Sequence, residues 1–198
     1  MTMIAVLGNG RVGGSLALAL TRAGHEVTVA DRSPGSAADA VRTARIVINA
    51  TPGAGSLERL IALREELRGK ILVDVSNATV DGPDGLPAEL LYPGSSLAEQ
   101  LQEALPDTRV VKTLNTMLYT VMTAPAALTQ APTAFLSGKD PEAKKVVRGL
   151  LADLSWQQEW ITDLGGIETA RAAEAAILFV PHVIRSSGFA PFAISITR

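Results

Sequence analysis

The sequence predicts a doubly wound α/β fold in which helices cover both faces of a mainly parallel β-sheet. Short runs of consecutive apolar residues recur along the chain, at positions 4–7, 27–29, 46–48, 71–73, 110–111 and 134–136. Runs of this kind, without polar alternation, are typical of strands that are covered on both faces. The segments between them have helical spacing, and alternating strands and helices favour a parallel sheet with right-handed crossovers. We also expect a trimmed outer edge of the sheet and a C-terminal helical extension.

The first elements follow one another closely. Val12, Leu16 and Leu20 recur at helical spacing directly after the first apolar run, which predicts a helix there. The twelve residues 33–44 separate the second run from the third, which is close to the minimum for a crossover between parallel strands. A complete dinucleotide-binding sheet normally places a helix, an outer strand and another helix in this interval. We therefore expect the second strand to lie at or near an edge of the sheet.

Two later helices begin with recognisable caps. Ser96 and Glu99 have the spacing of a capping box, in front of leucines that repeat every four residues. Asp140 is the expected N-cap of a further helix, with Pro141 at its first position. That helix has an apolar stripe formed by Val146, Val147, Leu150, Leu151 and Leu154.

Composition and charge exclude several classes of protein. The chain has 198 residues, of which 47% are hydrophobic, so it can bury a core without covalent staples. It contains no Cys, which excludes disulfide scaffolds, thiolate metal sites and cysteine catalysis, and no cluster of metal ligands is visible. The 18 basic and 20 acidic residues are scattered, which excludes a nucleic-acid partner and an anionic membrane surface. A small-molecule partner is therefore expected. The first residues do not resemble a secretory signal, so we expect a cytoplasmic protein. The apolar stretch 175–180 is far shorter than a membrane span.

A glycine-rich turn lies between the first strand and the first helix. The sequence there is Gly8-Asn9-Gly10-Arg11-Val12-Gly13, a G-x-G-x-x-G pattern. In a dinucleotide-binding turn the first glycine allows the tight turn, the second lets the backbone approach a pyrophosphate, and the third lets helix and strand pack closely. Free amides at the start of the helix direct a partial positive charge toward the phosphates. The position of the pattern, more than its letters, predicts a Rossmann-type NAD(P)-binding domain.

We expect residues 1–165 to form this NAD(P)-binding domain and residues 166–198 to form a helical extension packed on it, the two making a single structural domain. The extension is Ala-rich and is expected to be helical up to Pro181, which should kink or end the helix. Its apolar surplus could pack on the sheet or form an interface between two copies of the chain. A homodimer is thus one of two expectations for this segment.

The second strand ends in Asp31, Arg32 and Ser33, where the adenosine ribose of a dinucleotide would lie. These residues favour different cofactors. Asp31 can accept hydrogen bonds from a ribose 2′-hydroxyl, which favours NAD, and its charge repels a 2′-phosphate. Arg32 and Ser33 can instead hold the 2′-phosphate of NADP, unless Arg32 is a surface residue paired with Asp31. We expect NADP, with NAD as the alternative.

Three further strands end in small or polar residues, at positions 49–53, 74–77 and 112–116. In a parallel sheet these ends share the edge at which ligands bind. We expect Ala50, Thr51 and Pro52 to lie beside the nicotinamide half of the dinucleotide. Asn77 and Asn115 are expected to orient rings through neutral hydrogen bonds.

The segment 78–92 is rich in Gly and Pro, and we expect a loop that forms the rim of a site for a second substrate.

Side chains that could act as acids or bases are scarce in the sequence. His25 is expected on the edge of the sheet opposite the cleft, and His182 in a structural role. Lys112 ends an apolar strand near the cleft and could contact a phosphate or carboxylate, or form a structural salt bridge. No catalytic residue is assigned, and Lys112 and Asn115 are the candidates.

Several stretches of the chain match the pattern of a known family. They are Gly8-x-Gly10-x-x-Gly13, Ala50-Thr51-Pro52, Val73-Asp74-Val75-Ser76-Asn77, Val110-Val111-Lys112-Thr113-Leu114-Asn115-Thr116, Ser137-Gly138-Lys139-Asp140, and Asp163-Leu164-Gly165 through Ala170-Arg171. Together they resemble the NADPH-dependent reductases of the deazaflavin coenzyme F420. The resemblance covers nearly the whole chain, and the stretch 110–116 is its most specific part because many dehydrogenases share the glycine pattern.

The resemblance implies a Rossmann domain with a small C-terminal extension, often dimeric, that passes hydride between NADP and the deazaflavin. By position it implies that residues 8–13 bind the pyrophosphate and that Arg32-Ser33 binds the 2′-phosphate. It also implies that Thr51-Pro52 and Asn115 lie on the nicotinamide side.

Three functions are compatible with these residues. The leading hypothesis is an NADPH-linked oxidoreductase that hands hydride to a planar acceptor such as deazaflavin coenzyme F420 or a flavin. Hydride transfer between stacked rings needs alignment and exclusion of water more than a positioned acid, which suits the scarcity of acid–base residues. The second hypothesis is a reductase of a small carbonyl or imine compound, with Lys112 or a loop hydroxyl as proton donor. The third is a non-catalytic module that senses NAD(P) and acts by association.

Overall fold

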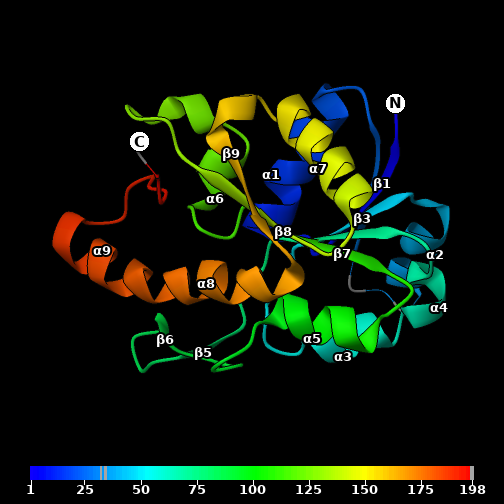
Figure 1. The fold of residues 1–198 in the computed structure, drawn as a ribbon, viewed down its shortest axis with the longest axis horizontal. Helices are drawn as coiled ribbons and strands as arrows, with labels where there is room; N and C mark the ends of the chain where they lie inside the picture. The colour runs from blue at the N-terminus through cyan, green and yellow to red at the C-terminus, as the bar shows by residue number, and fades with distance from the viewer. Residues whose placement is uncertain (32, 34, 197–198) are drawn as a thin grey trace.

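A computed structural model describes residues 1–31, 33 and 35–196 (Figure 1). Its centre is a seven-stranded sheet with the strand order β2-β1-β3-β4-β7-β8-β9. The strands are β1 (Met3–Leu7), β2 (Glu26–Ala30), β3 (Ile46–Asn49), β4 (Ile71–Asp74), β7 (Arg109–Lys112), β8 (Ala134–Ser137) and β9 (Ile161–Gly165). The first five in spatial order are parallel, β8 is antiparallel to β7, and β9 is parallel to β8. The predicted doubly wound, mainly parallel sheet is confirmed, and β9 is a further strand that none of the apolar runs predicted.

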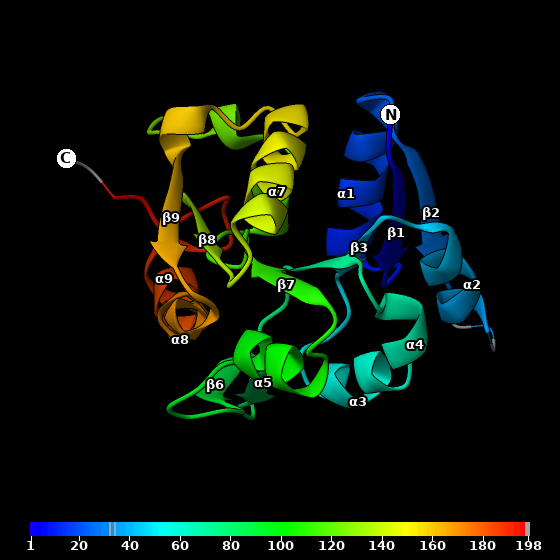
Figure 2. The same ribbon diagram turned by 45° about the vertical axis from the view of Figure 1, so that its right-hand side comes forward.

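Helices cover both faces of the sheet because successive residues of a strand point to opposite sides. Ile4 and Val6 of β1 belong to one hydrophobic cluster, whereas Ala5 and Leu7 belong to a second. The first cluster includes residues of α1 (Arg11–Arg22), α6 (Tyr119–Met122) and α7 (Pro141–Asp153). The second includes residues of α2 (Ser36–Thr43), α3 (Ser56–Ile61), α4 (Arg64–Leu67) and α5 (Leu97–Ala104). Figure 2 shows α1 and α7 on one side of the sheet and α3, α4 and α5 on the other.

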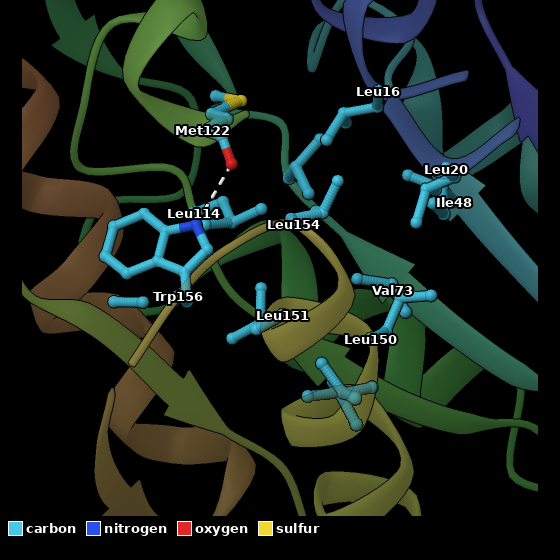
Figure 3. Close-up of a cluster of buried hydrophobic side chains, with 14 of the residues drawn as sticks. Leu16, Leu20, Ile48, Val73, Leu114, Met122, Leu150, Leu151, Leu154 and Trp156 are labelled. Carbon is cyan, nitrogen blue, oxygen red and sulfur yellow. Dashed lines mark hydrogen bonds between the residues drawn. The ribbon is translucent and has the colours of Figure 1, made fainter. Parts of the chain in front are cut away.

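Trp156 joins α6 and α7 inside the first cluster (Figure 3). Trp156 is 2% exposed, and its indole Nε1 donates a hydrogen bond to the carbonyl oxygen of Met122 at 3.0 Å. Two short 3-10 helices, η1 (Pro125–Ala127) and η2 (Gln158–Trp160), lie before and after α7 in the sequence. Because a buried indole N–H needs a partner, this bond fixes the end of α6 against the end of α7.

The two predicted helix caps are present. The Ser96 hydroxyl accepts a hydrogen bond from the backbone N–H of Glu99 at 3.1 Å. The Glu99 carboxylate in turn accepts from the Ser96 hydroxyl, and not from the Ser96 backbone N–H as in a standard capping box. Asp140 accepts from the N–H of Ala143 at 2.8 Å, with Pro141 at the first helical position.

The outer edge of the sheet is trimmed, as predicted. Strand β2 is the terminal strand, and the short crossover from β2 to β3 contains α2. This places the end of β2 next to α2 with no further strand beyond it. The adenosine end of the expected dinucleotide site is therefore bounded by α2 and the loops, and not by an outer strand.

The prediction of a loop over 78–92 is wrong. This segment contains the antiparallel pair β5 (Thr79–Asp81) and β6 (Pro87–Leu90), whose connecting turn places Gly85 at a φ of 72°. The hairpin packs against the C-terminal helices, and Asp84 forms an ion pair with Arg185 at 2.6 Å. Gly and Pro here specify the turn of a hairpin, which the sequence analysis interpreted as an irregular rim.

The C-terminal extension is helical beyond the predicted point. It consists of η3 (Ile167–Thr169), α8 (Ala170–Ala175), η4 (Ala176–Phe179) and α9 (Val180–Ser187), which follow one another in a row in Figure 1. Pro181 does not end the helix, because it occupies the first turn of α9. A proline cannot accommodate the carbonyl four residues earlier in a regular α-helix, which accounts for the 3-10 turn directly before it.

Candidate functional site

The three glycines of the turn between β1 and α1 have different environments. Gly8 has a φ of 107°, and a Cβ there would lie 2.5 Å from the carbonyl oxygen of Ala50. A Cβ on Gly13 would lie 1.8 Å from the carbonyl oxygen of Gly8. A Cβ on Gly10 would meet no atom within 4 Å. Gly8 and Gly13 are thus required for the turn and for close packing of helix on strand, whereas Gly10 faces open space.

The start of α1 can hold an anion. Gly10 is the N-cap and provides no side-chain hydrogen bond, and the first turn of α1 has no acidic residue. Uncapped amides at a helix N-terminus attract phosphate groups. The guanidinium of Arg11 lies 5.6 Å from the centroid of the Tyr119 ring and adds a positive charge to this end of the helix.

Asp31 and Ser33, to which the sequence analysis gave opposing roles, are bonded to each other. The Asp31 carboxylate accepts from the backbone N–H of Ser33 at 2.8 Å and from the Ser33 hydroxyl. These two hydrogen bonds hold the pKa of Asp31 below its ordinary value, the hydroxyl being the larger cause. Asp31 is exposed, so its ionised carboxylate faces solvent at the end of β2. The predicted site residue Arg32 lies outside the described residues.

Asn49 organises the loop that follows β3. Its buried Nδ2 donates to Ser56 Oγ and to Asp74 Oδ1, both at 2.8 Å, and its Oδ1 accepts from Thr51 Oγ1 at 2.7 Å. Gly53 packs directly on the loop after β4, because a Cβ there would lie 2.0 Å from the carbonyl oxygen of Asn77. The hydrogen bonds of Asn49 and the close approach that Gly53 allows together hold the loop after β3 against the loop after β4.

Asn77 and Asn115 form a reciprocal pair across the ends of β4 and β7. Asn115 Nδ2 donates to Asn77 Oδ1 at 2.9 Å, and Asn77 Nδ2 donates to the Asn115 carbonyl at 2.9 Å. The residue before Asn115, Leu114, has a φ of 59°, which is uncommon for a non-glycine residue. Asn115 Oδ1 and Thr116 Oγ1 are buried with no hydrogen-bond partner among the described residues. The pair is thus positioned by the backbone and retains hydrogen-bonding capacity.

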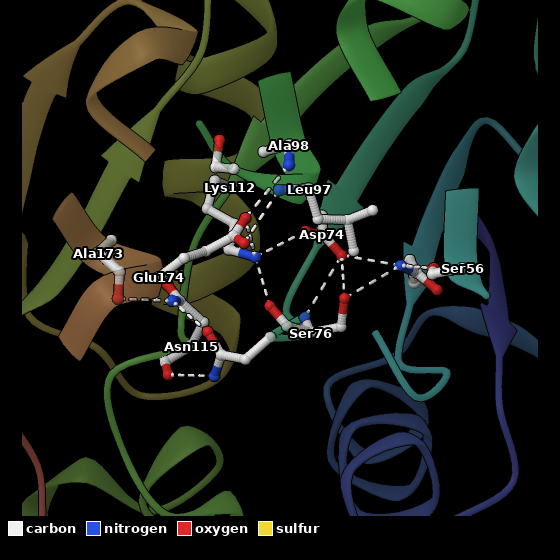
Figure 4. Close-up of polar contacts among 12 residues, drawn as sticks. Ser56, Asp74, Ser76, Leu97, Ala98, Lys112, Asn115, Ala173 and Glu174 are labelled. Carbon is white, nitrogen blue, oxygen red and sulfur yellow. Dashed lines mark hydrogen bonds and ion pairs between the residues drawn. The ribbon is translucent and has the colours of Figure 1, made fainter. Parts of the chain in front are cut away.

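Lys112 is surrounded by acceptors (Figure 4). Its Nζ lies 2.7 Å from Asp74 Oδ2 and 3.0 Å from Glu174 Oε1, and it donates to the Ser76 carbonyl. Burial alone would lower the pKa of Lys112, but the two carboxylates outweigh burial and hold the pKa above its ordinary value. Lys112 is 1% exposed, so it is a charged structural residue beneath the site, with its three donors directed to these acceptors.

A cleft of about 1580 Å³ runs along the carboxyl ends of the strands. One end, here called the glycine half, is formed by the β1–α1 turn, Asp31, Ala37 and residues of α3. The other end, here called the apolar half, is lined by Met117, Leu118, Tyr119, Met122, Ala176, Ile177, Phe179, Val180, Val183, Phe189, Phe192 and Ile194. Ala50, Thr51, Pro52, Asn77 and Asn115 lie between the two halves in the lining. Ligand pockets of drug-sized molecules occupy roughly 300–1,000 Å³, so this cleft has room for more than one.

The structure brings most of the predicted site residues together. The cleft lining contains Gly8, Asn9, Gly10, Arg11, Val12, Asp31, Ala50, Thr51, Pro52, Asn77 and Asn115. Three predicted residues are not part of it: Gly13 is buried against the strand, Ser33 is bonded to Asp31, and Lys112 lies beneath the floor.

Sequence reasoning missed two parts of the lining. Arg59 of α3 faces the cleft, where its Nη2 donates to the carbonyls of Pro52 at 2.5 Å and Ala54 at 3.0 Å. No local pattern distinguishes it from other exposed arginines. The apolar half is lined by residues within 117–122 and by the C-terminal extension, whereas the segment 78–92, expected as the rim, contributes no lining residue. The unusually apolar composition of the C-terminal extension was the feature of the sequence that could have indicated its part in this lining.

Comparisons with known proteins agree with this geometry. Residues 3–55, which include the glycine turn and the loop after β3, match the model of the family described as NADP oxidoreductase, coenzyme F420-dependent. A structure of a candidate F420-dependent NADP reductase from Arthrobacter sp. FB24 superimposes with a TM-score of 0.91 and 37% identity, and the match covers 100% of both chains. The chain belongs to this family.

Two further proteins are similar to this chain at lower identity or lower coverage. The F420-dependent NADP reductase of Methanocaldococcus jannaschii is 31% identical over 140 residues, which is 69% of this chain and 60% of that relative's length. A hypothetical protein from Sinorhizobium meliloti superimposes with a TM-score of 0.67 and 29% identity over 85% of this chain and 88% of that one. Across the described residues, none of the helices combines the length and apolar character needed to span a bilayer.

The contrast between Gly13 and its neighbour Gly14 is testable. We expect Gly13→Ala to destabilise the protein by about 1–3 kcal/mol, because the new methyl group collides with the Gly8 carbonyl. Gly14→Ala is the control: nothing lies within 4 Å of its Cβ position, and Ala in a helix is favoured over Gly by about 0.5–1 kcal/mol. Guanidinium unfolding followed by circular dichroism measures both changes. Equal effects of the two variants would contradict the packing role of Gly13.

Proposed function

We propose that this protein is an NADPH-linked oxidoreductase that transfers hydride between the nicotinamide and the deazaflavin coenzyme F420. The observation that carries the proposal is the single continuous cleft, whose glycine half suits a dinucleotide and whose apolar half suits a second flat ring system. Membership of the family and the names of its relatives support the choice of NADP and F420.

The residues fit a dinucleotide at the glycine half. The uncapped start of α1 and the open space at Gly10 form a cradle that a side chain at this position would fill. We propose that residues 8–13 hold the pyrophosphate and that Arg32-Ser33, with Asp31 beside it, meets the 2′ position of the ribose. Arg59, anchored by two loop carbonyls, adds its positive charge to that of Arg11 in the lining of the cleft.

The middle of the cleft is suited to orient a nicotinamide ring. Thr51, Pro52 and the Asn77–Asn115 pair all line this part of the cleft. The unpartnered Asn115 Oδ1 and Thr116 Oγ1 offer acceptors to an amide group of a ligand. With both groups bound, NADPH would supply a hydride to the deazaflavin, which would also take up one proton, leaving NADP⁺ and the reduced deazaflavin. The chain's own residues hold the two rings in contact and exclude water, which is the main requirement of such a transfer.

The alternative functions receive less support from the geometry. A carbonyl or imine reductase needs a proton donor, and Lys112, the candidate donor, is buried with three acceptors around it. Among the described residues of the cleft lining, the acidic groups are Asp31 and Tyr119. The hydrogen bonds from Ser33 lower the pKa of Asp31 and favour its ionised form, which leaves Tyr119 as the candidate proton donor. A non-catalytic sensing module would bind NADPH without turnover.

Three broader features belong to the same proposal. We infer that residues 1–165 carry the dinucleotide and that residues 166–198 supply the wall against the second ring.

Exposed Phe179 and Phe189, at 66% and 64%, support a homodimer in which this extension is partly covered. Cytoplasmic location is supported by the choice of cofactors, which serve metabolism inside cells.

The first experiment is an absorbance assay. Purified protein, NADPH and oxidised F420 are mixed, and the visible absorbance of the deazaflavin is followed. We expect its loss well above the protein-free control. Tight NADPH binding by calorimetry with no loss of absorbance would contradict the acceptor and favour the sensing module.

A second experiment uses Tyr119→Phe, which keeps the aromatic ring beneath Arg11 and removes only the hydroxyl. We expect kcat with F420 to stay within about threefold of the unaltered protein, because loss of a general acid costs about 10²–10⁴-fold. A collapse of the rate by a hundredfold or more would instead support a carbonyl or imine reductase with Tyr119 as donor.

Cofactor preference is tested with Asp31→Ser. The lowered pKa of Asp31 keeps its carboxylate ionised at neutral pH, so it repels a 2′-phosphate. We expect the substitution to raise the ratio of NADPH to NADH affinity by about tenfold, equivalent to 1.4 kcal/mol. Calorimetric Kd values for both dinucleotides measure the ratio, with Asp81→Ser on the hairpin as control. An unchanged ratio would show that Asp31 does not face the ribose.

A further inference from the structure

Glu174 is the main buried attachment of the C-terminal helices. The segment 170–187, comprising α8, η4 and α9, is here called the C-terminal rod. Its buried residues are Ala170, Ala173, Glu174 and Pro181. An alanine methyl group or a proline ring buries little apolar area compared with a large side chain. Among the rod residues, all of which the structure describes, Glu174 is therefore the one long side chain that is buried.

The partners of this carboxylate come from two other elements. Glu174 Oε1 lies 3.0 Å from Lys112 Nζ at the end of β7. The backbone N–H groups of Leu97 and Ala98, in the first turn of α5, donate to Glu174 Oε2 at 3.0 Å and to Oε1 at 3.2 Å. A negative charge at a helix N-terminus is favourable. Donors from two directions fix both the position and the orientation of the carboxylate (Figure 4).

The same rod reaches the cleft at two points. The carbonyl of Ala173, next to Glu174, accepts a hydrogen bond from Asn115 Nδ2 at 2.9 Å. One turn further along, rod residues line the apolar half of the cleft, namely Ala176, Ile177, Phe179, Val180 and Val183. A shift of the rod at Glu174 would thus move the Asn115 side chain and the apolar wall together.

We propose that Glu174 is a positioning residue: its ion pair with Lys112 and its contact with the start of α5 set where the C-terminal rod lies over the apolar half of the cleft. The inference rests on the proposed function for the identity of the ligand in that half, F420. Glu174 does not touch this ligand. It acts through the rod and through Asn115, and it leaves the glycine half untouched.

The charges of the buried cluster around Lys112 decide which variant can test the positioning role of Glu174. The buried cluster holds one cation, Lys112, and two carboxylates, Asp74 and Glu174. Glu174→Gln leaves the neutral Lys112–Asp74 pair, so no uncompensated buried charge results. Lys112→Met would leave two buried carboxylates without their cation, and its failure to fold would be uninformative. In Glu174→Gln the amide NH₂ group competes with Lys112 and the α5 amides, because all of these are donors.

The kinetic test separates the two halves of the cleft. In Glu174→Gln we expect KM for F420 to rise by about tenfold, while the calorimetric Kd for NADPH rises by no more than about threefold, because NADPH loses orientation only at Asn115 and keeps its contacts with the glycine half. Glu168→Gln is the matched control, since Glu168 is an exposed residue of η3 with the same change of charge. Equal weakening of NADPH and F420 in Glu174→Gln would indicate a general loss of structure and overturn the positioning role.

A second readout does not depend on activity. Hydrogen exchange of backbone amides in 176–187 should quicken at least tenfold in Glu174→Gln, with exchange in α1 and α7 unchanged, and neither should change in Glu168→Gln. Unchanged exchange across the rod would overturn the proposal. If the unaltered protein does not reduce F420, the proposed function fails, while this exchange experiment still decides whether Glu174 positions the rod.

Discussion

A cation buried in the centre of the sheet constrains the rest of the site. Lys112 is 1% exposed, and a buried charge without partners is strongly destabilising. The fold must therefore bring acceptors to the end of β7. The register of β4 against β7 places Asp74 directly opposite Lys112, and α8 supplies Glu174 from the other side. The C-terminal helices are consequently part of the site's foundation.

From Lys112 a chain of hydrogen bonds runs beneath the cleft. Asp74 links Lys112 to Asn49, and Asn49 links Asp74 to Thr51 in the cleft lining. Every member is buried or half-buried, and a satisfied buried network is rigid. The floor of the cleft is thus polar and fixed, whereas its far wall is apolar. A fixed floor that orients one ring and an apolar wall that covers a second ring are what transfer between stacked rings needs.

The sequence was sufficient for features that depend on local chemistry. The glycine turn, the Ser96 and Asp140 caps and the short crossover that leaves β2 at the edge all follow from residues close together in the chain. Features that depend on distant contacts were missed. Glu174 meets the N–H of Leu97 across 77 positions, and no pattern near Glu174 indicates a buried carboxylate. The hairpin at 78–92 was missed because its glycines and prolines are equally typical of turns and loops.

The scarcity of acid–base groups has a structural explanation. His25 bonds Asp153 of α7 at 3.0 Å, and His182 lies in a groove between the β5–β6 hairpin and α9, so neither histidine is among the residues that line the cleft. Lys112 is bonded to Asp74, Glu174 and the Ser76 carbonyl beneath the cleft. The ionisable side chains that do line the cleft are Arg11, Asp31, Arg59 and Tyr119, and the two arginines and the aspartate suit phosphate and ribose recognition better than proton transfer. Among the described residues of the lining, the one phenol is Tyr119 and the one carboxylate, Asp31, is exposed at the end of β2, so the site suits a reaction in which ring alignment is the main contribution of the protein.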